Sequence, residues 1–248
     1  MQLQQFFKQN PRIAVAYSGG VDSSYLLFAA DEAGCDVHAY FIKSEFQPQF
    51  ELDEAISLAK NLDIPLTIET LKVLGEPNIS TNPAKRCYHC KTKILENIWK
   101  LARADGFTVL CDGTNADDDE SDRPGMKALH ESGVLSPLRD CKLTKRKIRS
   151  LSKKAGLPTH DKPAYACLAT RIPTGTKITQ EFLTKIENAE ETLFEMGFSD
   201  FRVRLLPPDT AKIQMTAKQW KKAAAMRKKI TKELELDFNE VVLDLTER

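Results

Sequence analysis

The short segment SGGVDS, residues 18–23, constrains the fold of this chain more than any other. An apolar run at 13–16 precedes it and predicts a buried strand, and helical spacing from Val21 to Ala33, ending at Gly34, follows it. A glycine-rich turn between a strand and a helix gathers backbone N–H groups at the positive end of the helix. The sequence therefore predicts a loop that binds an anion.

The residue types of this loop fit a phosphate ligand. Gly19 and Gly20 permit a close approach to the backbone, and the hydroxyls of Ser18 and Ser23 can bond phosphate oxygens. The loop lacks the Gly-Lys-Ser/Thr ending that holds the γ-phosphate in ordinary triphosphatases, so we exclude that class. A tight turn that binds nothing is the alternative.

Strands and helices alternate through the first part of the chain. We expect further strands at 37–42, 66–71 and 107–111, and helices at 52–62 and 91–104. This order is typical of a parallel sheet with helices on both faces, so the predicted fold class is α/β.

The pattern changes from Thr144 onward. We expect a basic helix at 144–155, a proline-containing loop at 158–173 and then a small α+β domain. Its predicted helices are 179–196, with Thr179 as N-cap, and 218–234, and its predicted strands are 201–206, 212–215 and 240–245. We therefore divide the chain into residues 1–160 and residues 161–248.

Composition limits the possible partners. Lys and Arg number 36 against 35 Asp and Glu, a net charge of +1, which gives no reason to expect a nucleic acid. No apolar run approaches 18 residues and the start lacks a signal-peptide core, so we expect a cytoplasmic protein with no membrane partner. Its six cysteines should then be reduced thiols.

Three of the cysteines are candidates for chemistry. Cys87 and Cys90 lie in RCYHCK, just before the helix predicted from Lys91, and Cys167 lies in YACLATRIP. Basic neighbours and a helix N-terminus favour the thiolate form. Cys35, Cys111 and Cys141 stand alone, and Cys111 has the pattern of a buried apolar filler.

The spacing of these cysteines leaves several readings open. Three thiolates could hold a 4Fe-4S cluster with one iron open to sulfide. They could instead hold zinc completed by His89 or His160. The Cys-x-x-Cys pair could be a redox pair, or Cys167 could give up its own sulfur.

The loop SGGVDS resembles the pyrophosphate loop, or PP-loop, of the N-type ATP pyrophosphatases. This resemblance implies that ATP binds with its β- and γ-phosphates on the loop and that Asp22 helps to place Mg²⁺. It also implies that ATP is cleaved between its α- and β-phosphates, adenylating a carbonyl or carboxylate oxygen. The resemblance thus predicts a PP-loop domain followed by the small α+β domain.

Across its length the chain resembles the LarE-like family, ATP-dependent sulfur transferases that make the nickel-pincer nucleotide cofactor of lactate racemase. The segments that carry the resemblance are AYSGGVDSS, RCYHCK, VLCDGTNADD, the run 122–138, ACLATRIPTG and the AE…GF…RVR tail. In this family the cysteine at position 167 carries or anchors the sulfur. Some members have only this cysteine and sacrifice its sulfur. Others also have the Cys-x-x-Cys pair and resemble iron–sulfur-dependent enzymes. Because this chain has all three cysteines, we favour the cluster over the sacrificial version.

Other residues are expected to surround the nucleotide. In α/β sheets ligands bind at the carboxyl ends of strands, which places Gly113, Thr114 and Asn115 near AMP. Adenine is expected to stack near Phe41 or Ile42. Lys91 is a further cofactor-binding candidate, while residues 117–119 are either part of the site or a solvated acidic loop.

The resemblance also implies a substrate site in the second domain. Arg202 and Arg204 share one face of a strand and, with Arg171, would bind the phosphate of a mononucleotide. Glu190 is a further candidate, and surface charge is the plain alternative for the arginines. Thr170 replaces the usual serine, and relatives often continue with a Gly-rich tail beyond LDLTER. The basic helices around Lys145 and Lys221 are given no role.

Together these expectations predict an enzyme that uses ATP and Mg²⁺ to adenylate a carboxylate of pyridinium-3,5-biscarboxylic acid mononucleotide. Sulfur held by Cys87, Cys90 and Cys167 then displaces AMP and gives a thiocarboxylate. Its expected partners are this small substrate, sulfide or another sulfur donor, and further copies of the chain. A tRNA-thiolating enzyme and a nickel- or nucleotide-binding carrier without turnover are the alternatives.

Overall fold

The computed structural model describes residues 2–118 and 124–247. The chain forms two compact units. The first comprises Met1–Val73 and Lys85–Pro163, and the second comprises Leu74–Ala84 and Ala164–Arg248. Within the described ranges, the structure contains no helix with the length and apolarity needed to cross a membrane.

The first unit is built on a four-stranded parallel sheet. Its strands are β1 (Arg12–Ala16), β2 (Asp36–Lys43), β3 (Leu66–Thr70) and β4 (Leu110–Asp112). They lie in the order β3-β2-β1-β4, and every neighbouring pair is parallel. In the centre of the sheet, Val15 lies opposite Ala39 on one side and Cys111 on the other. The α/β prediction is confirmed.

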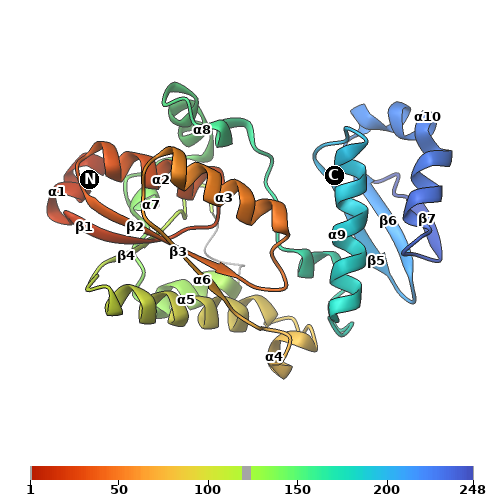
Figure 1. Ribbon diagram of the computed structural model, residues 1–248, viewed down its shortest axis with the longest axis horizontal. Coiled ribbons are helices and arrows are strands. Elements are labelled where there is room, and N and C mark those ends of the chain that lie inside the picture. The colour runs from red at the N-terminus through yellow and green to blue at the C-terminus, as the bar shows by residue number, and fades with distance from the viewer. Residues whose placement is uncertain (1, 119–123, 248) are drawn as a thin grey trace. The chain divides into compact units, whose positions relative to one another are not determined.

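Helices cover both faces of this sheet, with α2 and α3 on one and α5 and α6 on the other (Figure 1). The helical elements of the unit are α1 (Leu3–Gln9), α2 (Val21–Glu32), α3 (Gln49–Asn61), α5 (Arg86–Ala104), α6 (Pro124–Glu131), α7 (Pro137–Asp140), α8 (Lys145–Lys154) and the 3₁₀ turn η1 (Pro158–Asp161). Successive strand residues alternate between two cores. Val15 packs with Leu26 in one, and Ala14 packs with Leu95 in the other.

The helix that carries the Cys-x-x-Cys pair begins earlier than predicted. It begins at Arg86 rather than at Lys91, so Cys87 and Cys90 lie within its first two turns and not before it. The segment 86–104 contains no glycine or proline that would prevent this extension. The sequence analysis also missed α1, α4, α6 and α7.

The second unit is an α+β structure with a three-stranded sheet. Its elements are α4 (Pro77–Ser80), η2 (Leu168–Arg171), α9 (Gln180–Glu195), β5 (Phe201–Leu206), β6 (Thr210–Met215), α10 (Ala217–Leu234) and β7 (Glu240–Leu243). The strand order is β5-β6-β7, antiparallel between the first two and parallel between the last two. The predicted N-cap is confirmed, because the Thr179 hydroxyl accepts a hydrogen bond from the backbone N–H of Phe182 at 3.2 Å.

A segment distant in sequence belongs to this second unit. The Asn82 side chain is 1% exposed and donates to the carbonyl oxygens of Ile172 and Pro173 at 3.2 and 2.8 Å. The backbone N–H of Ile178 donates to the carbonyl of Ser80 at 2.8 Å. These bonds join residues 74–84 to the loop after η2.

Candidate functional site

The loop SGGVDS joins the end of β1 to the start of α2. Gly19 has a φ of 70°, and a Cβ there would lie 3.2 Å from the carbonyl oxygen of Glu51, so only glycine fits without displacing α3. Gly20 is the N-cap of α2 and has no side chain with which to cap it. The first N–H groups of the helix, which have no partner inside it, therefore point toward the loop.

The two serines of the loop have different surroundings. Ser23 is 3% exposed, and its hydroxyl lies 3.1 Å from that of Ser18 and donates to the Gly20 carbonyl at 3.2 Å. Ser18 is exposed. Ser23 thus fixes the shape of the loop, while the Ser18 hydroxyl is the one that a ligand can reach.

Asp22, in the first turn of α2, is the acidic centre of this region. One oxygen, Oδ2, pairs with the Lys145 ammonium and accepts a hydrogen bond from Asn115 Nδ2 at 3.4 Å. The other oxygen, Oδ1, is buried and has no hydrogen-bond partner among the described residues. Burial raises the pKa of this carboxyl, and the hydrogen bond from Lys145 opposes that shift. A carboxylate oxygen without a partner is the kind of ligand that a hard cation such as Mg²⁺ prefers, and the positive N-terminus of α2 beside it favours the phosphates that accompany such a cation.

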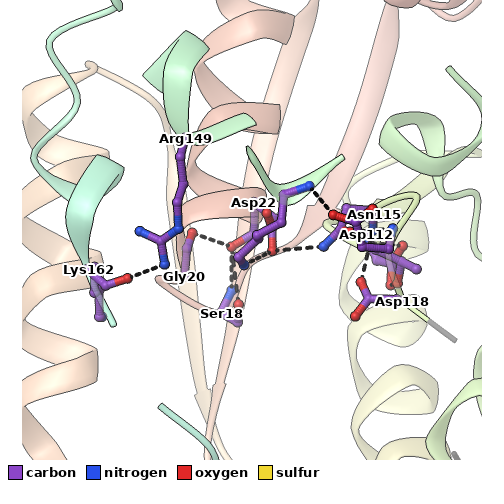
Figure 2. A network of polar contacts seen from close by, with 12 residues as sticks. Ser18, Gly20, Asp22, Asp112, Asn115, Asp118, Arg149 and Lys162 are labelled. Atoms are coloured by element: carbon purple, nitrogen blue, oxygen red, sulfur yellow. Dashed lines mark hydrogen bonds and ion pairs between the residues drawn. The ribbon is translucent and has the colours of Figure 1, made fainter. Parts of the chain in front are cut away.

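The end of β4 lies directly against the start of α2. A Cβ on Gly113 would lie 2.7 Å from the backbone nitrogen of Ser23, closer than real contacts allow. Before it, Asp112 accepts hydrogen bonds from the Thr114 backbone N–H at 3.2 Å and the Ser136 hydroxyl at 2.8 Å. The carboxyl ends of β1 and β4 therefore meet at one place, as expected for a ligand site in a parallel sheet. Figure 2 shows Asp22, Asp112 and Asn115 in this cluster.

The acidic loop after β4 supports this cluster. Asp118 accepts a hydrogen bond from the Asn115 backbone N–H at 3.0 Å, and Asp117 accepts one from the Lys145 backbone N–H at 2.8 Å. Both side chains thus bind backbone near Asp22, unlike those of a purely solvated loop. Asp119 lies outside the described residues.

The sequence analysis missed the basic residues that contact the loop. It gave the helix around Lys145 no role, whereas Lys145 pairs with Asp22 and Arg149 holds the next segment. Arg149 donates to the carbonyl of Lys162 at 2.7 Å (Figure 2) and to that of His160 at 2.8 Å. The Lys162 ammonium donates to the Gly19 carbonyl at 3.2 Å. The available signal was the four-residue spacing of Lys145 and Arg149, which places both on one helix face.

Two predicted nucleotide contacts have different surroundings from those expected. Phe41 is 2% exposed and Ile42 is 5% exposed, and each packs in one of the two cores. Neither side chain offers a face on which adenine could stack, because burial between sheet and helices covers both. Lys91 lies on α5, half-buried.

A buried ion pair occupies the predicted phosphate site of the second unit. The guanidinium of Arg171 is 0% exposed and binds Glu190 through two bonds, Nε to Oε1 at 2.9 Å and Nη2 to Oε2 at 3.2 Å. Arg171 Nη1 also donates to the Ala166 carbonyl, and Glu190 accepts from the Tyr165 hydroxyl and the Val203 backbone N–H. Arg171 therefore supports this unit from inside, and its prediction as a phosphate ligand is corrected.

The other two arginines keep the predicted arrangement. Arg202 and Arg204 are half-buried at alternate positions of β5 and share one face of the sheet. Arg204 Nη1 donates to the Thr170 carbonyl at 2.8 Å, and the Thr170 hydroxyl donates to the Cys167 carbonyl at 2.8 Å. Arg204 thus lies beside the turn that begins with Cys167, and Thr170 supplies the hydroxyl that a serine would supply there.

The three candidate cysteines are divided between the units. In the first unit, Cys87 is exposed and Cys90 half-buried, one turn apart on α5, and Arg86 Nη2 lies 3.4 Å from Cys87 Sγ. In the second unit, Cys167 is partly exposed at the start of η2. Within residues 2–118 and 124–247, no three His, Cys, Asp or Glu side chains are grouped as a metal site.

The isolated cysteines contribute no further site. Cys111 is 0% exposed and burial raises its pKa, which confirms its role as an apolar filler. Burial also raises the pKa of Cys35 and Cys141, which favours their thiol form.

Comparison with known proteins identifies relatives over most of the chain. It is 32% identical over 241 residues to the pyridinium-3,5-bisthiocarboxylic acid mononucleotide synthase of Lactiplantibacillus plantarum, covering 96% of this chain and 87% of that protein. It is 37% identical over 203 residues to an uncharacterized protein of Synechocystis, covering 82% and 76%. An uncharacterized protein of Methanocaldococcus jannaschii is 36% identical over 205 residues, covering 82% and 77%. No protein-family model matches the chain.

Proposed function

Because the chain belongs to the LarE-like family, we propose that it is an enzyme that transfers sulfur to a carboxylate of pyridinium-3,5-biscarboxylic acid mononucleotide in the pathway to the nickel-pincer cofactor. The observation that carries the proposal is the similarity to the synthase along 96% of the chain, including both units. The reducing cytoplasm is the proposed compartment, since the chemistry needs thiols.

The first half of the reaction is activation of the substrate by ATP. A carboxylate oxygen is a poor leaving group, and transfer of AMP to it, with release of pyrophosphate, makes it a good one. Loop 18–23 supports this step because it offers N–H groups and the Ser18 hydroxyl beside a helix N-terminus. Mg²⁺ binds proteins through one or two carboxylates together with substrate phosphates. Asp22 provides such a carboxylate, and its buried Oδ1 has no hydrogen-bond partner among the described residues.

The second half is replacement of AMP by sulfur. Sulfur attacks the activated carbonyl carbon, the carbon–oxygen bond to AMP breaks, and the thiocarboxylate and AMP leave. Cys87, Cys90 and Cys167 would hold a 4Fe-4S cluster, which supplies an open iron that can bind sulfide. The pair on α5 fits such a group, because two cysteines one turn apart lie on one helix face and Cys87 is exposed. Arg202 and Arg204 would bind the substrate phosphate.

The adenylation step can be tested without sulfur. With the dicarboxylate substrate present, the enzyme should move radiolabelled pyrophosphate into ATP, because adenylation runs backwards until sulfur arrives. Asp22→Asn should slow this exchange at least about 100-fold. Asp31→Asn, an exposed carboxylate at the other end of α2, should leave the exchange unchanged. Substrate-independent release of phosphate from ATP, without exchange, would refute this step.

The cluster needs its own test. Protein purified without oxygen should show broad visible absorption and bind about four iron atoms per chain. Serine at Cys87, Cys90 or Cys167 should remove the iron, and Cys141→Ser should not. A colourless protein after reconstitution, together with loss of the mass of H₂S at Cys167 after turnover, would refute the cluster and would show that Cys167 gives up its own sulfur.

A further inference from the structure

Two side chains that the reaction described above does not use, Gln214 and Asp244, are linked to Arg204 in the second unit. Gln214 of β6 accepts a hydrogen bond from Arg204 Nε through its Oε1, and its Nε2 donates to Asp244 Oδ2 at 2.9 Å. Gln214 lies opposite Arg202 in the pairing of β5 with β6, so it shares the sheet face that carries both arginines. The segment after β7 is thereby connected to Arg204.

The two neighbours of Gln214 determine which way its amide group points. A guanidinium can only donate hydrogen bonds, and a carboxylate can only accept them. If the amide turned over, its NH₂ group would face Arg204 Nε and its oxygen would face the carboxylate of Asp244. The order of these three side chains therefore fixes the amide with its oxygen toward Arg204.

Asp244 is itself held in place. Its carboxylate pairs with the Lys212 ammonium at 2.9 Å and accepts a hydrogen bond from the Thr246 backbone N–H at 2.9 Å. These two donors hold the pKa of the carboxyl well below its usual range. The backbone N–H of Asp244 also donates to the Ile213 carbonyl at 2.9 Å. Asp244 is thus an ionised acceptor that is fixed beside Gln214.

Two bonds orient the guanidinium of Arg204. Nε donates to Gln214, and Nη1 donates to the Thr170 carbonyl at 2.8 Å. Because the guanidinium is planar, acceptors on two different segments determine its direction. Both acceptors are uncharged oxygens, so these bonds do not cancel the positive charge, unlike the bonds between Arg171 and Glu190. They suit an arginine whose charge meets an anion.

We propose that Gln214 is a positioning residue that, oriented by Asp244, holds Arg204 in the direction in which it binds the phosphate of the mononucleotide substrate. This inference rests on the proposed function, because it takes that phosphate as the anion that Arg204 binds. A guanidinium that is already oriented loses less side-chain freedom when the ligand binds. Gln214 thereby sets the affinity for the substrate and leaves the chemistry at the carboxylate unchanged.

The test measures pyrophosphate–ATP exchange at varied concentrations of pyridinium-3,5-biscarboxylic acid mononucleotide. In Gln214→Met the KM for this substrate should rise about 5- to 10-fold, the scale of one hydrogen bond. The maximal rate should stay within about twofold, because the interaction is made equally in the ground state and the transition state. Thr210→Val, which removes a hydrogen bond to Glu240 at the start of β6, should leave both quantities unchanged.

A double-mutant cycle distinguishes positioning from a general loss of structure. If Gln214 acts through Arg204, adding Gln214→Met to Arg204→Met should change kcat/KM by less than about twofold. Asp244→Ala should raise KM about 2- to 4-fold, because Gln214 keeps its bond to Arg204 but its amide can turn over. The same change should add nothing to Gln214→Met.

The outcomes separate this inference from the proposed function. Equal KM values for wild type and Gln214→Met would overturn the inference alone, and so would a lower maximal rate at unchanged KM. Effects of Gln214→Met and Arg204→Met that multiply in the double variant would mean that Gln214 only supports the sheet, and would also overturn it. A wild-type protein that shows no exchange with the mononucleotide would overturn both.

Discussion

Arg171 and Glu190 form an ion pair that is closed to solvent, with side-chain exposures of 0% and 2% and two bonds of 2.9 and 3.2 Å. The guanidinium also lies 4.6 Å from the centre of the Tyr165 ring. The pair links the turn after Cys167 to α9, and the Val203 N–H bond extends it to β5. Its role is to hold the second unit together around the turn that begins with Cys167.

The first prediction concerns the stability of this unit. Arg171→Met leaves the Glu190 carboxylate buried without its counter-ion, so the free energy of unfolding should fall by about 3–5 kcal/mol. Denaturant unfolding measures it. The exposed pair Lys127–Glu131, 3.7 Å apart, is the matched control, and Lys127→Met should change stability by less than about 1 kcal/mol. If Arg171→Met unfolds like the wild type but binds substrate less tightly, Arg171 is a ligand after all.

A second prediction follows from the contact between Gly113 and Ser23. In Gly113→Ala the new Cβ meets the Ser23 backbone, so the start of α2 must shift, at a cost of about 1–3 kcal/mol. Binding of ATP should weaken along with stability, because the same N–H groups form the loop. Gly75→Ala is the control, since a Cβ there meets nothing within 4 Å. Wild-type ATP affinity in Gly113→Ala would show that α2 and β4 need not meet so closely.

The third prediction concerns alkaline pH. Burial raises the pKa of Tyr17, just before the loop, to about 12, whereas the unfolded chain ionises it near 10. The stability that Tyr17 contributes is therefore full below pH 10 and is lost as the pH rises toward 12. Tyr17→Phe should abolish this loss, about 2 kcal/mol by pH 11.5. Parallel stability curves for the two proteins between pH 9 and 11.5 would argue against this assignment.

The fourth prediction concerns Lys162, which donates to the Gly19 carbonyl and pairs with Glu54. Lys162→Met removes the bond that fixes the loop peptide, so ATP affinity should fall about 3- to 10-fold. Hydrogen exchange at the Gly20 amide should become faster at the same time. Lys153→Met, an exposed lysine of α8, should change neither quantity. Weaker ATP binding with unchanged hydrogen exchange at Gly20 would mean that Lys162 acts through its charge and not by fixing the loop peptide.

The sequence predicted the features that local patterns determine. The strand, turn and helix around SGGVDS follow from hydrophobic periodicity and two glycines, and the Thr179 cap follows from its place before an amphipathic helix. The shared face of Arg202 and Arg204 follows from the two-residue repeat of a strand. Each of these depends on neighbours within one element.

The features that the sequence did not predict depend on contacts between distant segments. Lys145 meets Asp22 across 123 positions, and no local pattern marks that pair. Arg171 has the sequence context of a ligand, and only the packing of α9 shows that Glu190 neutralises it. Likewise, the burial of Phe41 depends on how α2 and α3 cover the sheet.

The account can be tested most directly by the mass of the product. Purified protein is incubated with pyridinium-3,5-biscarboxylic acid mononucleotide, Mg²⁺ and sulfide, with ATP or without it. The account predicts replacement of a carboxylate oxygen by sulfur only when ATP is present, with one AMP and one pyrophosphate formed for each sulfur transferred. Sulfur transfer without ATP, or with ADP and phosphate as products, would contradict it.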